Sequence, residues 1–82
     1  MHSHTRLSAK RTDDLPVSKR GNSFVSAELQ RVRAGFLVTM NDRRGGKWCP
    51  PPKDRTHPTA DSAVGYIRSN HPEVVSVFVR LA

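Results

Sequence analysis

The spacing of apolar residues divides the chain after position 23 into strand-like and helical segments. Residues 36–40, Phe-Leu-Val-Thr-Met, are rich in strand formers and lead into a turn-forming Asn-Asp pair. Residues 43–46, Arg-Arg-Gly-Gly, supply the glycines that a hairpin loop needs. Residues 47–49 then return as a short strand, which ends at the three prolines of 50–52 because proline cannot donate a hydrogen bond to a sheet.

The preceding segment, 26–35, fits two interpretations. As a helix it would begin with Ser26 as N-cap and end before Gly35. As a strand it alternates Ala27 and Leu29 with polar neighbours and turns at its end into the next strand. We prefer the strand, because a helix here would offer few apolar contacts, with arginines among them. A three-stranded meander follows from this choice.

A helix is predicted over about 60–69, with Thr59 as its N-cap and Pro72 beyond its end. Four apolar residues share one face at helical spacing, and Tyr66 lies one position off that face and should be partly exposed. The four are Ala60, Ala63, Val64 and Ile67.

The last segment, 74–81, reads Val-Val-Ser-Val-Phe-Val-Arg-Leu and predicts a buried strand. Both of its faces are fairly apolar, which is typical of strands that are central in a sheet or covered by a partner. The predicted fold is therefore α+β: a small β-β-β-α-β two-layer sandwich over 23–82, with one helix on a sheet of three to four strands.

Residues 1–22 are predicted to form a disordered basic N-terminal arm. They contain only Leu7, Leu15 and Val17 as sizeable apolar residues, without a periodic spacing. Such a segment cannot bury enough apolar surface to offset its ordering entropy. Two basic pairs in it, 10–11 and 19–20, suit either a nucleic-acid arm or a merely solvated tail.

The charge of the 82-residue chain, +7 in total, is unevenly distributed. Residues 1–22 carry five basic and two acidic side chains, residues 23–55 carry seven and three, and residues 56–82 carry two of each. The whole excess thus lies in the arm and in the first half of the domain. A basic surface attracts polyanions, of which nucleic acid is the commonest in a cell.

The strongest candidate for binding is the basic hairpin, whose cations could follow a phosphate backbone. Trp48 beside it could stack on an unpaired base, although a core position is the simpler role for this ring. Arg31 and Arg33, two apart on the predicted strand, should point to one face. The complete set of predicted nucleic-acid-binding residues is Arg31, Arg33, Arg43, Arg44, Lys47, Trp48, Lys10, Arg11, Lys19 and Arg20.

Metal binding and catalysis find little support in the sequence. Cys49, His57 and His71 lack the spacing of a zinc site, and a fourth ligand is not evident. A small buried thiol and two turn histidines are the simpler interpretation. No catalytic motif and no phosphate-binding loop is present. We therefore expect a protein that is not an enzyme and has no metal site or cofactor.

The expected location is the cytoplasm, because no apolar stretch is long enough to cross a bilayer, no signal peptide is evident, and one cysteine excludes an internal disulfide. The expected partner is DNA or RNA, contacted through its backbone. The alternative is a protein-interaction module, an inhibitor or adaptor of a kind common in phages and mobile elements, that docks on a larger host protein. Strand 74–81 could pair with that partner or form a homodimer.

Overall fold

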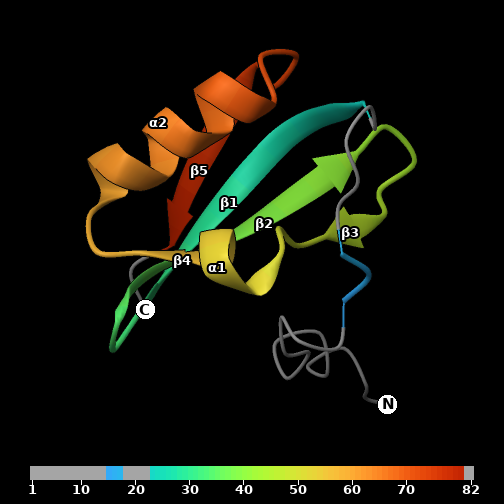
Figure 1. Cartoon of the computed structure of the whole chain (residues 1–82). Helices are drawn as coiled ribbons and strands as arrows, with labels where there is room; N and C mark the ends of the chain where they lie inside the picture. Colours follow the sequence, from blue (N-terminus) through green and yellow to red (C-terminus); the bar gives the residue numbers. More distant parts are fainter. Residues whose placement is uncertain (1–14, 18–22, 81–82) are drawn as a thin grey trace.

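One mixed sheet with a helix on one face makes up the domain (Figure 1). The structure is a computed structural model, which describes residues 15–17 and 23–80. Within these residues the elements, in chain order, are β1 (Phe24–Val32), β2 (Gly35–Asp42), β3 (Lys47–Trp48), α1 (Pro52–Arg55), β4 (Thr56–His57), α2 (Ala60–Asn70) and β5 (Ser76–Arg80). The predicted α+β class with one main helix is confirmed, and residues 26–32 lie in a strand, not a helix.

The strands follow the order β3-β2-β1-β5, and β4 pairs with the start of β2. β1 and β2 form an antiparallel hairpin, in which Val32 lies opposite Gly35 and Leu29 opposite Val38. β5 runs parallel to β1, so α2 is the crossover that carries the chain back to the same end of the sheet (Figure 1). Because β1 lies between its partners β2 and β5, the alternation of side chains along β1 determines which residues of the neighbouring strands share each face of the sheet.

The helix-facing side of β1 and β2 forms the core with α2. Thr59 caps the helix as predicted, since its hydroxyl accepts a hydrogen bond from the backbone N–H of Ser62 at 3.1 Å. Ile67 is 1% exposed, and Tyr66 is half-buried beside the predicted apolar face. The buried cluster consists of Phe24, Ala27, Leu29, Val38, Met40, Ala63 and Ile67.

Two short elements were not predicted from the sequence. Pro51 has extended backbone angles and Pro52 occupies the first turn of α1, a position where the missing N–H costs nothing. β4 then pairs with β2 beside Gly35, where the backbone of residues 57–58 passes so closely that no side chain would fit. Gly35 also has φ +137°, in the region that favours glycine.

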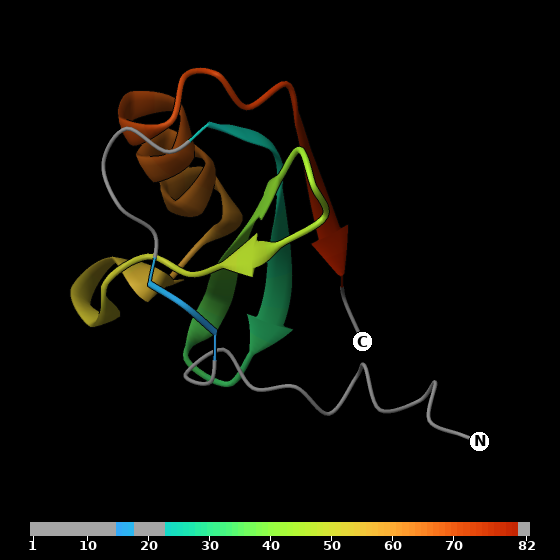
Figure 2. The same ribbon diagram turned by 90° about the vertical axis from the view of Figure 1, so that its right-hand side faces the viewer.

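The predicted C-terminal strand is present as β5, but the expectation that it is buried is wrong. Val74 and Val77 do pack against the core, but Val75 is 85% exposed and Phe78 is 56% exposed. The reason is topological: β5 pairs with β1 on one side only and forms one edge of the sheet (Figure 2). Helix α2 covers the sheet nearer to β1 and β2, which leaves the outer part of β5 open.

A piece of the predicted arm contacts the domain. The N–H of Cys49 donates a hydrogen bond to the carbonyl oxygen of Pro16 at 3.0 Å, and Val17 forms a parallel bridge with Cys49. Residues 15–17 therefore lie against the chain just after β3. The rest of the arm predicted over 1–22 lies outside the described residues.

Candidate nucleic-acid interface

The basic turn between β2 and β3, residues 43–46, is held in shape by the carboxylate of Asp42. Its oxygens accept hydrogen bonds from the backbone N–H groups of Arg44 (2.9 Å) and Gly46 (2.7 Å) and from the Trp48 indole (3.0 Å). Gly45 supplies the positive φ, +87°, that closes the turn. The turn is thus a defined platform from which Arg43 and Arg44 project into solvent.

These contacts set the ionisation of Asp42. The hydrogen bond from the Trp48 indole, together with those from the backbone of Gly46 and Arg44 and the positive charge of Arg44, lowers the pKa of Asp42 below its ordinary value of 3.8. A carboxylate with a lowered pKa stabilises the folded turn above pH 3.8. That contribution is lost as the pH falls through the lower, folded-state pKa.

We therefore predict that acid loosens this turn without unfolding the domain first. In an NMR titration from pH 6 to pH 2, the Trp48 indole N–H resonance should shift with a midpoint below 3.8, because its acceptor becomes protonated. Asp42→Asn keeps an oxygen acceptor and should remove this titration step. A midpoint at or above 3.8 in the unsubstituted protein would contradict the arrangement.

Two members of the predicted hairpin site have other partners. The ammonium of Lys47 lies 3.0 Å from Glu28 and donates a hydrogen bond to Asn41 at 2.9 Å. Trp48 is half-buried against the core, with its indole bound to Asp42. Both contacts favour structural roles for these two side chains over phosphate or base contacts.

The open face of the sheet is centred on Glu28, which also lies 3.3 Å from Arg80. Burial by itself raises the pKa of Glu28, but Lys47, Asn41 and Arg80 together lower it below its usual value. Both described helices lie on the opposite side of the sheet (Figure 2). Its two cations are therefore already balanced in part by a carboxylate.

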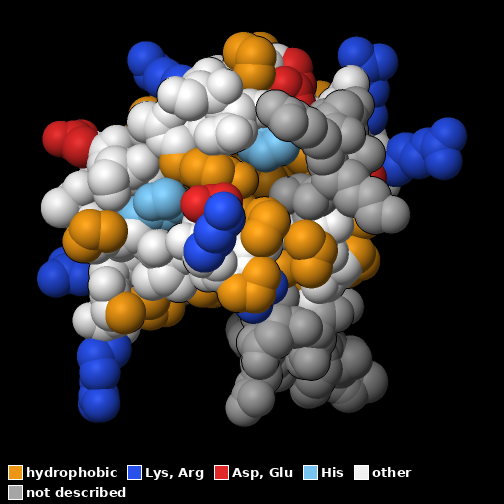
Figure 3. All heavy atoms as spheres, in the orientation of Figure 1, with side chains coloured by type: hydrophobic (Ala, Val, Ile, Leu, Met, Phe, Trp, Pro, Cys, Tyr) orange, Lys and Arg blue, Asp and Glu red, His pale blue; other side chains and the backbone are white. Residues whose placement is uncertain are grey.

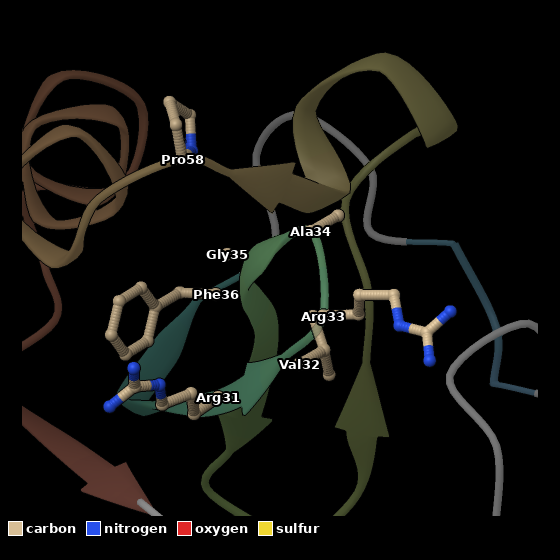
Figure 4. Close-up of a pocket in the computed structure, with 7 residues that line it drawn as sticks. All are labelled: Arg31, Val32, Arg33, Ala34, Gly35, Phe36 and Pro58. Carbon is tan, nitrogen blue, oxygen red and sulfur yellow. The ribbon is translucent and has the colours of Figure 1, made fainter.

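Arg31 and Arg33 lie at the other end of the hairpin and do not share a face. β1 ends at Val32, so Arg33 belongs to the turn, where the alternation of a strand no longer holds. Figure 4 shows the two guanidinium groups pointing away from each other. The expectation that they point to one face is wrong.

The same turn contains a feature that the sequence did not indicate. A shallow hollow of about 360 Å³ lies at the β1–β2 turn, and its lining includes Phe36, Pro58 and both arginines (Figure 4). Phe36 is opposite Arg31 in the register of the hairpin and opposite His57 on the other side. Phe36 packs against the edge of the core and also lines this hollow, a position that the strand pattern of residues 36–40 did not indicate.

The two basic turns are separated by the length of β2. Eight residues of strand, at about 3.3 Å each, place the pairs Arg31/Arg33 and Arg43/Arg44 roughly 26 Å apart. On the face toward the viewer in Figure 3, Lys and Arg side chains project at several separate places. The structure brings the predicted residues into two groups rather than one patch. The arm residues Lys10, Arg11, Lys19 and Arg20 lie outside the described part of the chain.

The cysteine and histidines have contacts within the protein. The buried Cys49 thiol approaches the carbonyl oxygens of Leu15 (3.7 Å) and Pro16 (3.8 Å). His57 Nε2 lies 2.7 Å from the carbonyl oxygen of Asp54, and His71 is buried edge-on against Phe24. Among residues 15–17 and 23–80, no three side chains of the metal-binding types are grouped together.

Comparison with models of protein families, with curated proteins and with solved structures finds no match for this chain. Neither described helix has the length and hydrophobicity needed to cross a membrane. The case for a function therefore depends on the geometry and charge of the domain itself.

Proposed function

We propose that this domain is a nucleic-acid-binding accessory protein that contacts the phosphate backbone through the two arginine turns of the β1–β2–β3 meander. One observation carries the proposal: the four exposed arginines at the two ends of β2 take part in none of the ion pairs within the described residues. They are Arg31, Arg33, Arg43 and Arg44. Arginine suits this role because its planar guanidinium can donate two parallel hydrogen bonds to a phosphate.

The spacing of the turns suits an extended polyanion. Two sites about 26 Å apart correspond to roughly eight base pairs, at about 3.4 Å of rise per pair. The open face of the sheet carries Lys47 and Arg80 against one carboxylate, Glu28, so it does not repel a polyanion. A phosphate backbone that runs from one turn to the other would then meet an arginine at either end.

Salt dependence tests this proposal. Each phosphate contact releases counterions, so four contacts should give a slope of log affinity against log salt near −4 on duplex DNA and near −3 on a single strand. Replacing Arg43 and Arg44 by Ser should flatten the slope by about two, and the same change at Arg31 and Arg33 should do likewise. Fluorescence anisotropy with a 20-base-pair duplex, and with either of its strands, measures both slopes.

A variant of equal charge serves as the control. Lys53→Ser combined with Arg68→Ser also removes two exposed cations, but from α1 and α2. This pair should leave the slope within about half a unit of the original. The proposal fails if the unsubstituted protein does not bind either probe at low salt, or if the control flattens the slope as much as the turn variants.

Docking on a larger host protein, as an inhibitor or adaptor, is the second candidate. The observation that favours it is the exposed apolar edge of β5, at Val75, Phe78 and Val79. A pull-down from lysate separates the two functions. Partners lost after nuclease treatment support nucleic-acid binding, whereas one protein retained after nuclease supports docking.

A further inference from the structure

The edge strand β5 has an unusual surface for a strand that pairs on one side only. No described segment pairs with its outer side (Figure 2). Natural edges are commonly protected by lysine, proline or a bulge, because their free N–H and C=O groups can pair with another chain. Residues 75–79 contain no charged residue and no proline, and Val75, Phe78 and Val79 are 85%, 56% and 49% exposed.

We propose that β5 pairs antiparallel with β5 of a second copy of this chain, around a two-fold axis at Phe78. The pairing would join two sheets into one continuous sheet. A two-fold axis uses the same surface on both copies, so one self-complementary strand is sufficient. Both arginine turns lie outside this strand.

The residues of β5 match in this register. Phe78 would face its own copy on the open side of the sheet, beside Glu28, its neighbour on β1. Val77 would face Val79 of the second copy on the helix side, which shields valine surface that α2 leaves exposed. Pairs of aromatic and β-branched residues are among the cross-strand pairs that stabilise neighbouring strands.

Charge favours this occupant and this direction. Parallel pairing in register would place Arg80 against Arg80, whereas antiparallel pairing places it opposite the neutral Ser76. Within its own chain Arg80 is already 3.3 Å from Glu28, so the edge offers little free charge to recognise an acidic partner. The Arg43–Arg44 turn joins β2 to β3 on the other side of the sheet, which keeps these cations of the two copies apart.

Sedimentation of the full chain across a range of concentrations tests the proposal. The unsubstituted protein should form a weak, concentration-dependent dimer, as small interfaces do. Ser76→Lys would face Arg80 of the second copy and should weaken the dimer roughly 3- to 30-fold, because the contact occurs twice. Ser76→Glu should strengthen it by a similar factor.

Matched variants remove the effect of net charge. Ser69→Lys and Ser69→Glu make the same charge changes on the exposed surface of α2 and should alter the dimer less than twofold. Melting curves of all four variants establish that each one folds. The proposal is overturned if the unsubstituted protein remains a monomer at all concentrations up to about 1 mM. Equal responses at positions 76 and 69, or a monomer that instead captures a strand of another protein, also overturn it.

Discussion

Gly35→Ala should cost roughly 2–6 kcal/mol of folding free energy, from two separate causes. Gly35 has φ +137°, and a side chain in such a conformation costs about 1–3 kcal/mol. The added Cβ would also overlap the carbonyl group of His57 and lie 2.9 Å from the Cα of Pro58. These are backbone atoms, so β4 would have to move away from β2, and such overpacking costs about 1–3 kcal/mol more.

Thermal unfolding followed by circular dichroism measures this effect. For a domain of this size, 1 kcal/mol lowers the melting temperature by about 4–8 °C, so Gly35→Ala should lower it by at least about 10 °C. Gly45→Ala is the matched control, because Gly45 also has a positive φ, +87°, but has open space around its Cα. The Gly45→Ala variant should lose only about 1–2 kcal/mol of folding free energy. Equal losses of folding free energy at both positions would show that the backbone of β4 does not lie close enough to Gly35 to exclude a side chain.

Ile67→Ala should destabilise the domain by about 2–5 kcal/mol. Ile67 is 1% exposed and packs in the cluster where α2 meets β1 and β2, so its truncation removes buried methyl groups and leaves a cavity. A small domain has a total stability of only about 0.05–0.15 kcal/mol per residue. The variant should therefore be partly unfolded near physiological temperature, as urea denaturation would reveal by a lower midpoint.

Arg68→Ala is the neighbouring control for this experiment. Arg68 is exposed on the same helix, and surface substitutions usually change stability by no more than about 0.5 kcal/mol. Ile67→Val should fall between the two, at about 0.5–1.5 kcal/mol. A loss below about 0.5 kcal/mol for Ile67→Ala would mean that α2 presents a different face to the sheet.

The candidate interface was only partly predictable. Exposed arginines beside a glycine turn were evident from residues 43–46, because hairpin loops have a local sequence signature. The ion pair between Lys47 and Glu28 was not evident from the sequence. Glu28 lies 19 residues away and comes close to Lys47 only through the pairing of β1, β2 and β3. Arg33 was assigned to the wrong element, because the end of a strand depends on its partner's register as much as on its own residues.

Local patterns were enough to determine strand β2, the basic turn, and helix α2 with its cap at Thr59, whereas for β1 they only favoured a strand over a helix. The physical reason is that turn chemistry, capping and alternation act over a few residues. Tertiary structure decided what depends on distant neighbours. It placed β5 at an edge although its sequence is that of a buried strand, and it inserted β4 beside Gly35. It also separated Arg31 and Arg33 from Arg43 and Arg44 by the length of β2, because an extended strand holds the residues at its two ends far apart.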